Sequence, residues 1–364
     1  MPLSVTAASL AEVLDEMTTE GAPELTEHLP KNAVKCYACG HRCLITSGKR
    51  GICKVRFNEG GHLRVPVNYV AALACDPTEK KPFFHALPGS DTLTFGMLGC
   101  DLHCAYCQNW LTSQALRDDA AVSPPNVVSA DRLVAMAKAY GASMVGSSYN
   151  EPLITAEWAV EVFKRAKVEG FRTAFISNGN ATPQVLDYLR PWTDCYKIDL
   201  KSMSDRNYRQ LGGVVDNILD TVKMVHERGF WEEIVTLVIP GFNSSEDELK
   251  RAADFIASVS PDIPWHVTAF HQDYHMRDKA NTTAEQLIRA CEIGRDAGLR
   301  YVYAGNLPGR VGRWENTYCP NCDELLVERY GYIIRQMNVT REGRCPSCAT
   351  TIPGIWFSSN PESL

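Results

Sequence analysis

The sequence has no apolar run that approaches the ~18 to 20 residues needed to span a membrane. Its first segment, Met1 to Glu20, contains acidic residues instead of the basic stretch and following apolar run of a secretory signal. The first absence excludes a membrane-spanning chain, and the second disfavours an exported one. We therefore expect a soluble, cytoplasmic protein.

An excess of positive charge is also missing. The chain has a formal net charge of -6 and a sequence pI near 5.9, so it offers no general cationic surface to attract phosphate backbones. Nonspecific binding of nucleic acid is therefore disfavoured. A hydrophobic content of 45% excludes disorder for most of the chain, and 364 residues provide room for one large domain and small additional modules.

Cysteine, in contrast, is abundant. The chain has fourteen cysteines, most of them in tight groups with the spacing of metal ligands. In a long chain without an export signal, such groups favour metal binding over disulfides. One group places four thiols within eighteen residues, namely Cys36, Cys39, Cys43 and Cys53. A closed set of four suits either a structural zinc or an auxiliary iron-sulfur cluster, and the residues alone do not separate the two.

A second group consists of two Cys-Pro-x-Cys pairs near the C-terminus, separated by 22 residues: Cys319 and Cys322, then Cys345 and Cys348. Two strand-like segments, Leu325 to Glu328 and Tyr332 to Met337, lie between the pairs. This pattern predicts a zinc-ribbon or rubredoxin-like module. Zinc is the default metal over a single iron, because nothing nearby suggests a redox role. The module could also be a docking surface.

The third group is odd-numbered. Cys100, Cys104 and Cys107 follow a CxxxCxxC spacing, and the aromatic Tyr106 precedes the last of them. A structural site normally closes with four protein ligands, whereas a reactive centre keeps one position open. Three thiolates therefore predict an open site, such as a [4Fe-4S] cluster with one iron that lacks a protein ligand. The alternative is a zinc knuckle completed by His103.

From Thr92 to about Asn306 the chain repeats a short apolar run, a polar or glycine-containing loop and an amphipathic helix. The predicted strands are 93–97, 144–148, 173–177, 195–200, 234–239, 265–270 and 301–304, and the predicted helices are 129–140, 156–169, 215–228, 246–259 and 283–297. This alternation predicts an α/β fold with a parallel sheet. About 215 residues are few for a closed eightfold barrel of ~250, so we expect an open, partial (β/α)6 TIM-like barrel. A doubly wound sheet is the structural alternative.

The chain is expected to divide into four segments. Residues 1–30 form an N-terminal arm, residues 31–90 a Cys-rich metal-binding module, residues 91–310 the partial barrel and residues 311–364 the zinc-ribbon-like module. Polar residues follow the predicted strands of the barrel, where parallel strands present their functional groups. The candidates at these strand ends are Asn150, Glu151, Ser177, Asn178, Asp199, Lys201 and His271. The structural alternatives are a surface ion pair for Asp199 with Lys201, a turn at Asn178 and a hydrogen-bonded structural histidine at position 271.

Gly99 to Trp110, which includes the cysteine triad, resembles the signature of the radical S-adenosylmethionine (SAM) superfamily. With Cys36 to Cys53, Asp76 to Pro82 and the C-terminal ribbon, the chain is similar to the radical SAM protein of the AmmeMemoRadiSam system, related to pyruvate formate-lyase activating enzymes. The resemblance implies that the triad holds a [4Fe-4S] cluster that binds SAM, and that the strand-end candidates bind SAM. It also implies an electron donor of the flavodoxin or ferredoxin type.

The same resemblance implies an enzyme that cleaves SAM reductively to a 5′-deoxyadenosyl radical, which takes hydrogen from an unidentified substrate. A protein glycine, as in glycyl-radical activating enzymes, is one possible substrate and a small molecule is another. The alternative is a nonenzymatic metal-binding scaffold whose four-cysteine modules recognise a protein or nucleic acid. The chain departs from the family pattern at Tyr149 and Asn150, where the glycines of a Gly-Gly-Glu-type motif are absent.

Overall fold

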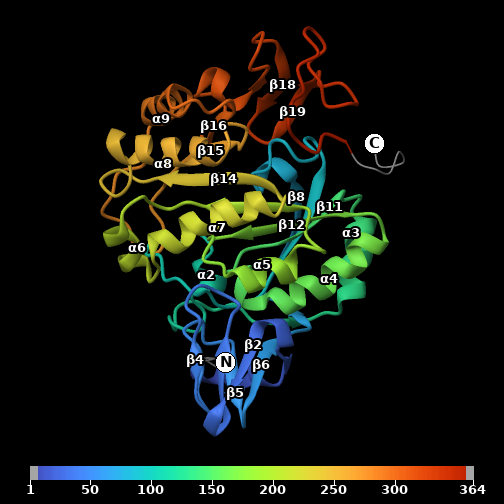
Figure 1. Ribbon diagram of the computed structural model, residues 1–364, viewed down its shortest axis with the longest axis vertical. Helices are drawn as coiled ribbons and strands as arrows, with labels where there is room; N and C mark the ends of the chain where they lie inside the picture. Colours follow the sequence, from blue (N-terminus) through green and yellow to red (C-terminus); the bar gives the residue numbers. More distant parts are fainter. Residues whose placement is uncertain (1–6, 358–364) are drawn as a thin grey trace, which may run out of the picture.

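The computed structural model describes residues 7–357, and an eight-stranded sheet forms its centre (Figure 1). Seven strands are parallel: β9 (Asp91–Gly96), β11 (Met144–Ser147), β12 (Arg172–Ser177), β13 (Cys195–Asp199), β14 (Trp231–Val238), β15 (Trp265–Ala269) and β16 (Val302–Gly305). They follow one another in chain order, and β16 ends the sheet. At the other edge β8 (Ala72–Pro77) pairs antiparallel with β9, so the sheet is not closed.

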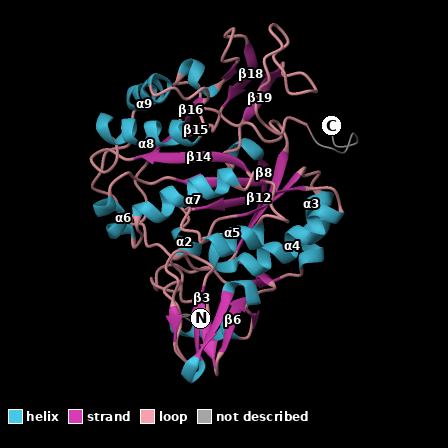
Figure 2. Cartoon of the chain, in the orientation of Figure 1, coloured by secondary structure: helices cyan, strands magenta, loops and turns pink. Residues whose placement is uncertain are grey.

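Helices connect the parallel strands and lie outside the sheet (Figure 2). The α-helices are α1 (Ala7–Asp15), α2 (Trp110–Ser113), α3 (Ala130–Ala139), α4 (Ala156–Val168), α5 (Pro183–Leu189), α6 (Asp205–Leu211), α7 (Val215–Glu227), α8 (Glu246–Val259) and α9 (Ala284–Asp296). Six strand-to-strand connections from β9 to β16 carry α2 to α9, whereas α1 precedes the sheet, and this confirms the expected (β/α)6 architecture. The sequence did not predict β8, α5 or α6.

Side-chain caps start three of the long helices, α3, α8 and α9, where the sequence predicts them. The Ser129 hydroxyl accepts a hydrogen bond from the Arg132 backbone N–H at the start of α3. Thr283 and Gln286 form a reciprocal capping box at the start of α9. Because such caps satisfy backbone groups that a helix end leaves unpaired, the helix positions follow from short sequence patterns.

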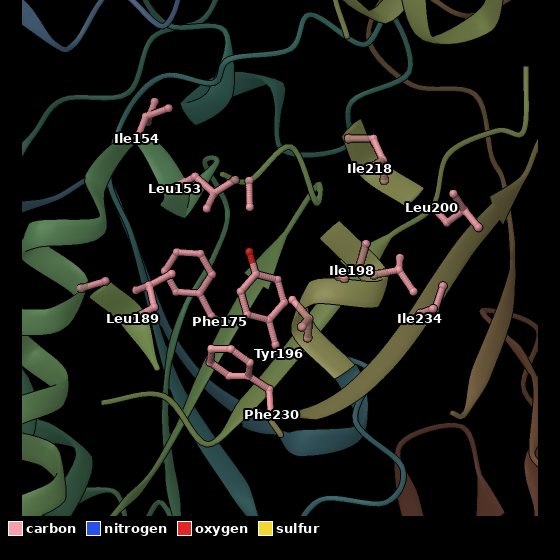
Figure 3. Packing of buried hydrophobic residues seen from close by; sticks show 14 of the residues in the cluster. Leu153, Ile154, Phe175, Leu189, Tyr196, Ile198, Leu200, Ile218, Phe230 and Ile234 are labelled. Atoms are coloured by element: carbon pink, nitrogen blue, oxygen red, sulfur yellow. The ribbon is translucent and has the colours of Figure 1, made fainter. Parts of the chain in front are cut away.

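The main core lies between the sheet and its helices. Figure 3 shows Phe175 and Tyr196 from neighbouring strands beside Leu189 of α5 and Phe230, all of them buried. The rings of Phe175 and Tyr196 lie 5.3 Å apart. Parallel strands covered by helices are apolar on both faces, which explains the short continuous apolar runs in the sequence.

The N-terminal part forms small antiparallel sheets below the main sheet in Figure 1. Their strands are β1 (Thr18–Glu20), β2 (Thr26–Leu29), β3 (Ala33–Cys36), β4 (Leu44–Ile45), β5 (Phe57–Glu59) and β6 (His62–Pro66). A further small pair joins β7 (Tyr69–Val70) to β10 (Asn126–Val127). The hairpin predicted around Asn58 to Gly61 is the β5–β6 pair. Residues 18–29 pair with the Cys-rich segment, and the domain boundaries themselves stay a prediction.

The C-terminal part is a three-stranded antiparallel sheet of β17 (Thr317–Tyr318), β18 (Leu325–Tyr330) and β19 (Ile333–Met337). It packs on Tyr301 and Tyr303 at the amino end of β16 and on Phe84. The N-terminal sheets and this ribbon therefore lie at opposite ends of the barrel (Figure 1). None of the described helices is long and apolar enough to cross a lipid bilayer.

Candidate metal and SAM site

The cysteine triad lies in the loop that follows β9, at the carboxyl end of the parallel strands. The Cys100 sulfur accepts a hydrogen bond from the Leu102 backbone N–H at 3.4 Å, and Cys107 Sγ lies 3.1 Å from the Ser113 hydroxyl. An apolar cluster surrounds the loop and contains Leu102, Cys104, Tyr106, Leu211, Ile239 and Phe270. Within this shell Cys104 is buried, whereas Cys100 and Cys107 are half-buried.

The triad has the properties of a cluster-binding loop. Burial raises the pKa of the Cys104 thiol to about 12, and the nearby Lys201 cation works in the opposite direction. Burial and the neighbouring Asp101 likewise raise the pKa of Cys100. Without a bound cation these buried thiols stay protonated, whereas iron would stabilise their thiolates. The residues therefore fit an iron-sulfur cluster.

His103, the residue that could complete a zinc knuckle, points elsewhere. Its ring lies against Gly212 at the end of α6, and its backbone N–H donates to the Leu211 carbonyl. Among residues 7–357, His103 and the triad do not belong to any set of three candidate ligand atoms within 4.8 Å of one another. His103 is therefore not placed to act as a fourth ligand beside the triad.

Asp101 connects the triad loop to the loop after β12, and the sequence analysis did not identify it. Its buried carboxylate accepts hydrogen bonds from the Asn178 and Asn180 side-chain amides at 2.8 and 2.7 Å. The Asn178 amide also lies 4.0 Å from the Cys100 sulfur. The only available signal was the place of an acidic residue directly after the first cysteine of the motif.

Asn150 and Glu151 lie in the loop after β11 and join three strand ends. The Asn150 amide oxygen accepts a hydrogen bond from the Met97 N–H at 2.9 Å. Glu151 accepts hydrogen bonds from the Ser177 hydroxyl at 2.7 Å and the Asn178 backbone N–H at 2.8 Å. Burial and the charge of Asp101 raise the pKa of Glu151 to about 8. These four predicted residues therefore meet beside the triad.

Tyr149 precedes these residues with a φ of +69°, a left-handed conformation that glycine adopts without strain. Gly96 lies opposite Tyr149, and a Cβ added at Gly96 would come 2.7 Å from the Tyr149 Cβ. The chain thus keeps the backbone turn that glycine would favour while placing a tyrosine there. Strain of this kind is common at functional loops.

Asp199 is the last residue of β13 and Lys201 follows the strand, and both belong to a larger charged group. Lys197 and Lys201 both donate to the Asp199 carboxylate, the second at 3.2 Å. Burial alone would raise the pKa of Asp199, but the two lysine cations lower it to about 2. Lys197 was not predicted, although alternate positions of a strand share a face and residues 197 and 199 both lie on β13.

His271 lies at the outer edge of the site in the loop after β15. Its Nε2 is 3.1 Å from the Gln108 side-chain nitrogen, and its ring is exposed. In the same loop the Tyr274 ring stacks on Trp110 at 5.1 Å, and the His275 backbone N–H donates to the Ala105 carbonyl. This loop therefore packs against the triad loop and brings His271 to the rim of the site.

The two four-cysteine groups lie at opposite ends of the barrel, and all fourteen cysteines are free thiols. Sulfurs of the C-terminal group converge, with 3.5 Å between Cys319 and Cys348 and 3.6 Å between Cys322 and Cys345. All four atoms lie within 4.8 Å of one another, which fits a single metal ion. In the N-terminal group Cys36, Cys39 and Cys53 are buried and Cys43 is half-buried.

Comparisons with known proteins agree with this geometry. The Radical SAM superfamily model matches residues 95–256. The chain is 34% identical over 329 residues to the uncharacterized protein MJ0808 of Methanocaldococcus jannaschii, covering 90% of this chain and 97% of that protein.

The chain is also 28% identical over 199 residues to the pyruvate formate-lyase 1-activating enzyme of Escherichia coli, covering 51% of this chain and 78% of that enzyme. A domain of a pyruvate-formate lyase-activating enzyme from Bacteroides vulgatus matches 44% of this chain and 98% of that domain, at 25% identity and a TM-score of 0.40. The chain therefore belongs to one family with the M. jannaschii protein and is an enzyme of the radical SAM superfamily.

Proposed function

We propose that Cys100, Cys104 and Cys107 hold a [4Fe-4S] cluster whose remaining iron binds SAM. When bound and reduced, this cluster supplies the electron that cleaves SAM to methionine and a 5′-deoxyadenosyl radical, which takes hydrogen from a substrate. The observation that carries the proposal is the three-thiol loop at the carboxyl ends of the strands, with His103 turned toward Gly212. The membership in the radical SAM superfamily supports it.

The polar residues around the triad are proposed to orient SAM. Glu151 offers a carboxylate for the amino group of SAM, and Asn150, Ser177 and Asn178 hold that carboxylate and its loop in place. Asp199 and Lys201 are proposed to contact the nucleoside, since the Lys201 cation acts on Cys104. His271 would contact the outer part of the ligand. Orientation is the main contribution that a protein makes to such cofactor chemistry.

A substrate protein and a one-electron donor protein are the proposed partners. The similarity to an activating enzyme supports a substrate of the protein-glycine class, and a donor of the flavodoxin or ferredoxin type would reduce the cluster. The overall resemblance supports a place in the AmmeMemoRadiSam system. We further propose zinc at the C-terminal site, because its four converging sulfurs match a tetrahedral ion.

The test is product analysis with anaerobically reconstituted protein, SAM and dithionite. We expect 5′-deoxyadenosine and methionine from the wild type, and a loss of both for Cys104→Ala. The matched control is Cys291→Ala, which removes a buried thiol of α9 that lies outside all three cysteine groups and should leave both products. Continued product formation by Cys104→Ala would refute the assignment of the triad.

A further inference from the structure

The N-terminal thiols at positions 36, 39, 43 and 53 have no role in the function proposed above. They come from the end of β3 and from the two loops that follow, and together they form a compact group. The Cys36 backbone N–H donates to the Cys43 carbonyl at 3.0 Å, and a Cβ at Gly51, two residues before Cys53, would come 3.6 Å from the Cys43 sulfur. Cys43 therefore lies between Cys36 and the loop that carries Cys53.

The spacing of these sulfurs differs from that of the C-terminal group. One zinc ion with Zn–S bonds of about 2.3 Å brings its four sulfurs to about 3.8 Å from one another, as at Cys319 and Cys348. Within the described chain, the C-terminal group is the only set of three or more candidate ligands within 4.8 Å. In the N-terminal group and in the triad, no three sulfurs lie that close to one another. An iron-sulfur cluster binds each thiolate at a different iron, so it accommodates such wider spacing.

The N-terminal thiol loops also lie directly against the triad loop. The Arg117 side chain donates to the Cys100 carbonyl at 2.7 Å and to the Ile52 carbonyl at 2.8 Å, and Ile52 precedes Cys53. A Cβ at Gly99, the residue before Cys100, would come 3.2 Å from the Cys53 carbonyl oxygen. The Arg117 guanidinium therefore connects the backbone of Cys100, in the triad, with the backbone next to Cys53, in the N-terminal group.

A second connection lies on the other side of the group. His41, between Cys39 and Cys43, has its Nε2 3.0 Å from the Asp101 carbonyl oxygen. The Gly40 backbone N–H donates to the Asn180 carbonyl at 2.7 Å, and Asn180 also binds the Asp101 carboxylate. Hydrogen bonds thus connect the loops of the N-terminal thiol group and of the triad. The C-terminal four-cysteine group lies at the far end of the barrel (Figure 1).

We propose that Cys36, Cys39, Cys43 and Cys53 bind a second iron-sulfur cluster beside the triad loop, instead of a single zinc ion. Its role rests on the proposed function: the position suits passage of single electrons between the triad and a reduced donor protein of the ferredoxin or flavodoxin class. Each transfer moves one electron and breaks no bond. The metal assignment itself depends only on the N-terminal thiols.

The test measures iron, acid-labile sulfide and zinc in the full chain after anaerobic reconstitution. For wild type we expect about eight iron atoms per chain, from two four-iron clusters. The variant Cys100→Ala/Cys104→Ala/Cys107→Ala should keep about four irons with matching sulfide. Adding both Cys39→Ala and Cys43→Ala to that variant should remove most of the remaining iron. Only Cys36 and Cys53 then remain, fewer than the three thiols that hold the triad cluster.

The outcomes separate the two proposals. If the triad variant binds no iron, and it and the wild type each bind about two zinc ions per chain, the second cluster is overturned. If the triad variant and the wild type both bind about four irons, the second cluster stands and the proposed function of the triad fails. The Cys291→Ala protein serves as the control and should match the wild type in all three contents, because its thiol lies in the core of α9.

Discussion

Among single residues, Asp101 has the largest structural role in the site. Its carboxylate is buried and receives two side-chain amides from the loop after β12. Its backbone carbonyl receives His41 from the N-terminal loop. Three separate segments therefore meet at one residue, directly beside the first cysteine of the triad.

Replacing Asp101 with Ala leaves the buried amides of Asn178 and Asn180 without their acceptor. We expect the free energy of unfolding to fall by about 2–4 kcal/mol, because each unsatisfied buried polar group is costly. Chemical denaturation under anaerobic conditions measures this change. Asp187→Ala is the control: its carboxylate is 66% exposed and pairs with Arg228, so the change should stay within about 0.5 kcal/mol. Equal losses for both variants would contradict the role of Asp101.

The sequence predicted individual site residues unevenly. Cysteine spacing predicted three thiol groups, because cysteines a few residues apart can reach a common metal site. The structure brings the sulfurs of the C-terminal group within 4.8 Å of one another. Glu151, Ser177 and Asn178 were found from their places after strands, and the structure brings them together. Asp101 was missed because its partners lie far away in the sequence. Lys197 was missed although its partner, Asp199, lies only two residues further along the chain. The roles of these residues toward SAM stay predictions.

At the scale of elements, the loop after β3 docks on the mouth of the barrel. Gly40 lies at this contact, and a Cβ at this position would overlap the side chains of Asn180 and Asn217. The Asn217 amide in turn donates to the Asn180 side-chain oxygen at 2.8 Å. A glycine is therefore required for the close approach of the N-terminal loop to the barrel.

Gly40→Ala should push this loop away from the barrel and lower the free energy of unfolding by about 1–3 kcal/mol, as overpacking does. Hydrogen exchange of the Asn180 region should increase. The control is Gly51→Ala, which makes the same substitution in the same N-terminal segment. A Cβ at Gly51 would lie at an ordinary 3.4 Å from its nearest neighbour. We therefore expect little change for Gly51→Ala. A Gly40→Ala protein as stable as wild type would show that the loop does not dock closely.

The elements themselves were largely predictable. Apolar runs of four to six residues followed by amphipathic helices identify the seven parallel strands and the five long helices. The antiparallel strand β8 escaped prediction because its partial exposure and Cys75-Asp76-Pro77 ending resemble a loop. The seven-residue helices α5 and α6 are too short to give a clear periodic signal.

At the scale of the whole molecule, a buried histidine joins the C-terminal segment to the barrel. His85 donates from Nδ1 to the Pro353 carbonyl at 2.7 Å and accepts at Nε2 from the Tyr303 hydroxyl at 2.6 Å. Burial lowers the pKa of His85 to about 4. Because this arrangement needs a neutral ring, protonation would break the link to Tyr303.

Lowering the pH should therefore reduce the free energy of unfolding through protonation of His85. The unfolded chain binds a proton here below about pH 6.5 and the folded chain only below about pH 4, so stability falls as the pH drops through this window. The expected contribution is about 3 kcal/mol. Denaturation of wild type and His85→Gln at several pH values from 7 to 4 measures it. The variant should be less stable at pH 7 but show a shallower slope, and parallel slopes would contradict this account.

The central claim is that the triad holds a [4Fe-4S] cluster in which one iron has no protein ligand and binds SAM. The direct measurement is the EPR spectrum of the reduced, anaerobically reconstituted protein before and after addition of SAM. We expect SAM to change the signal of the triad cluster, and we expect no such change in the Cys104→Ala variant. A wild-type spectrum that stays the same at saturating SAM, in protein with its full iron and sulfide content, would contradict the central claim.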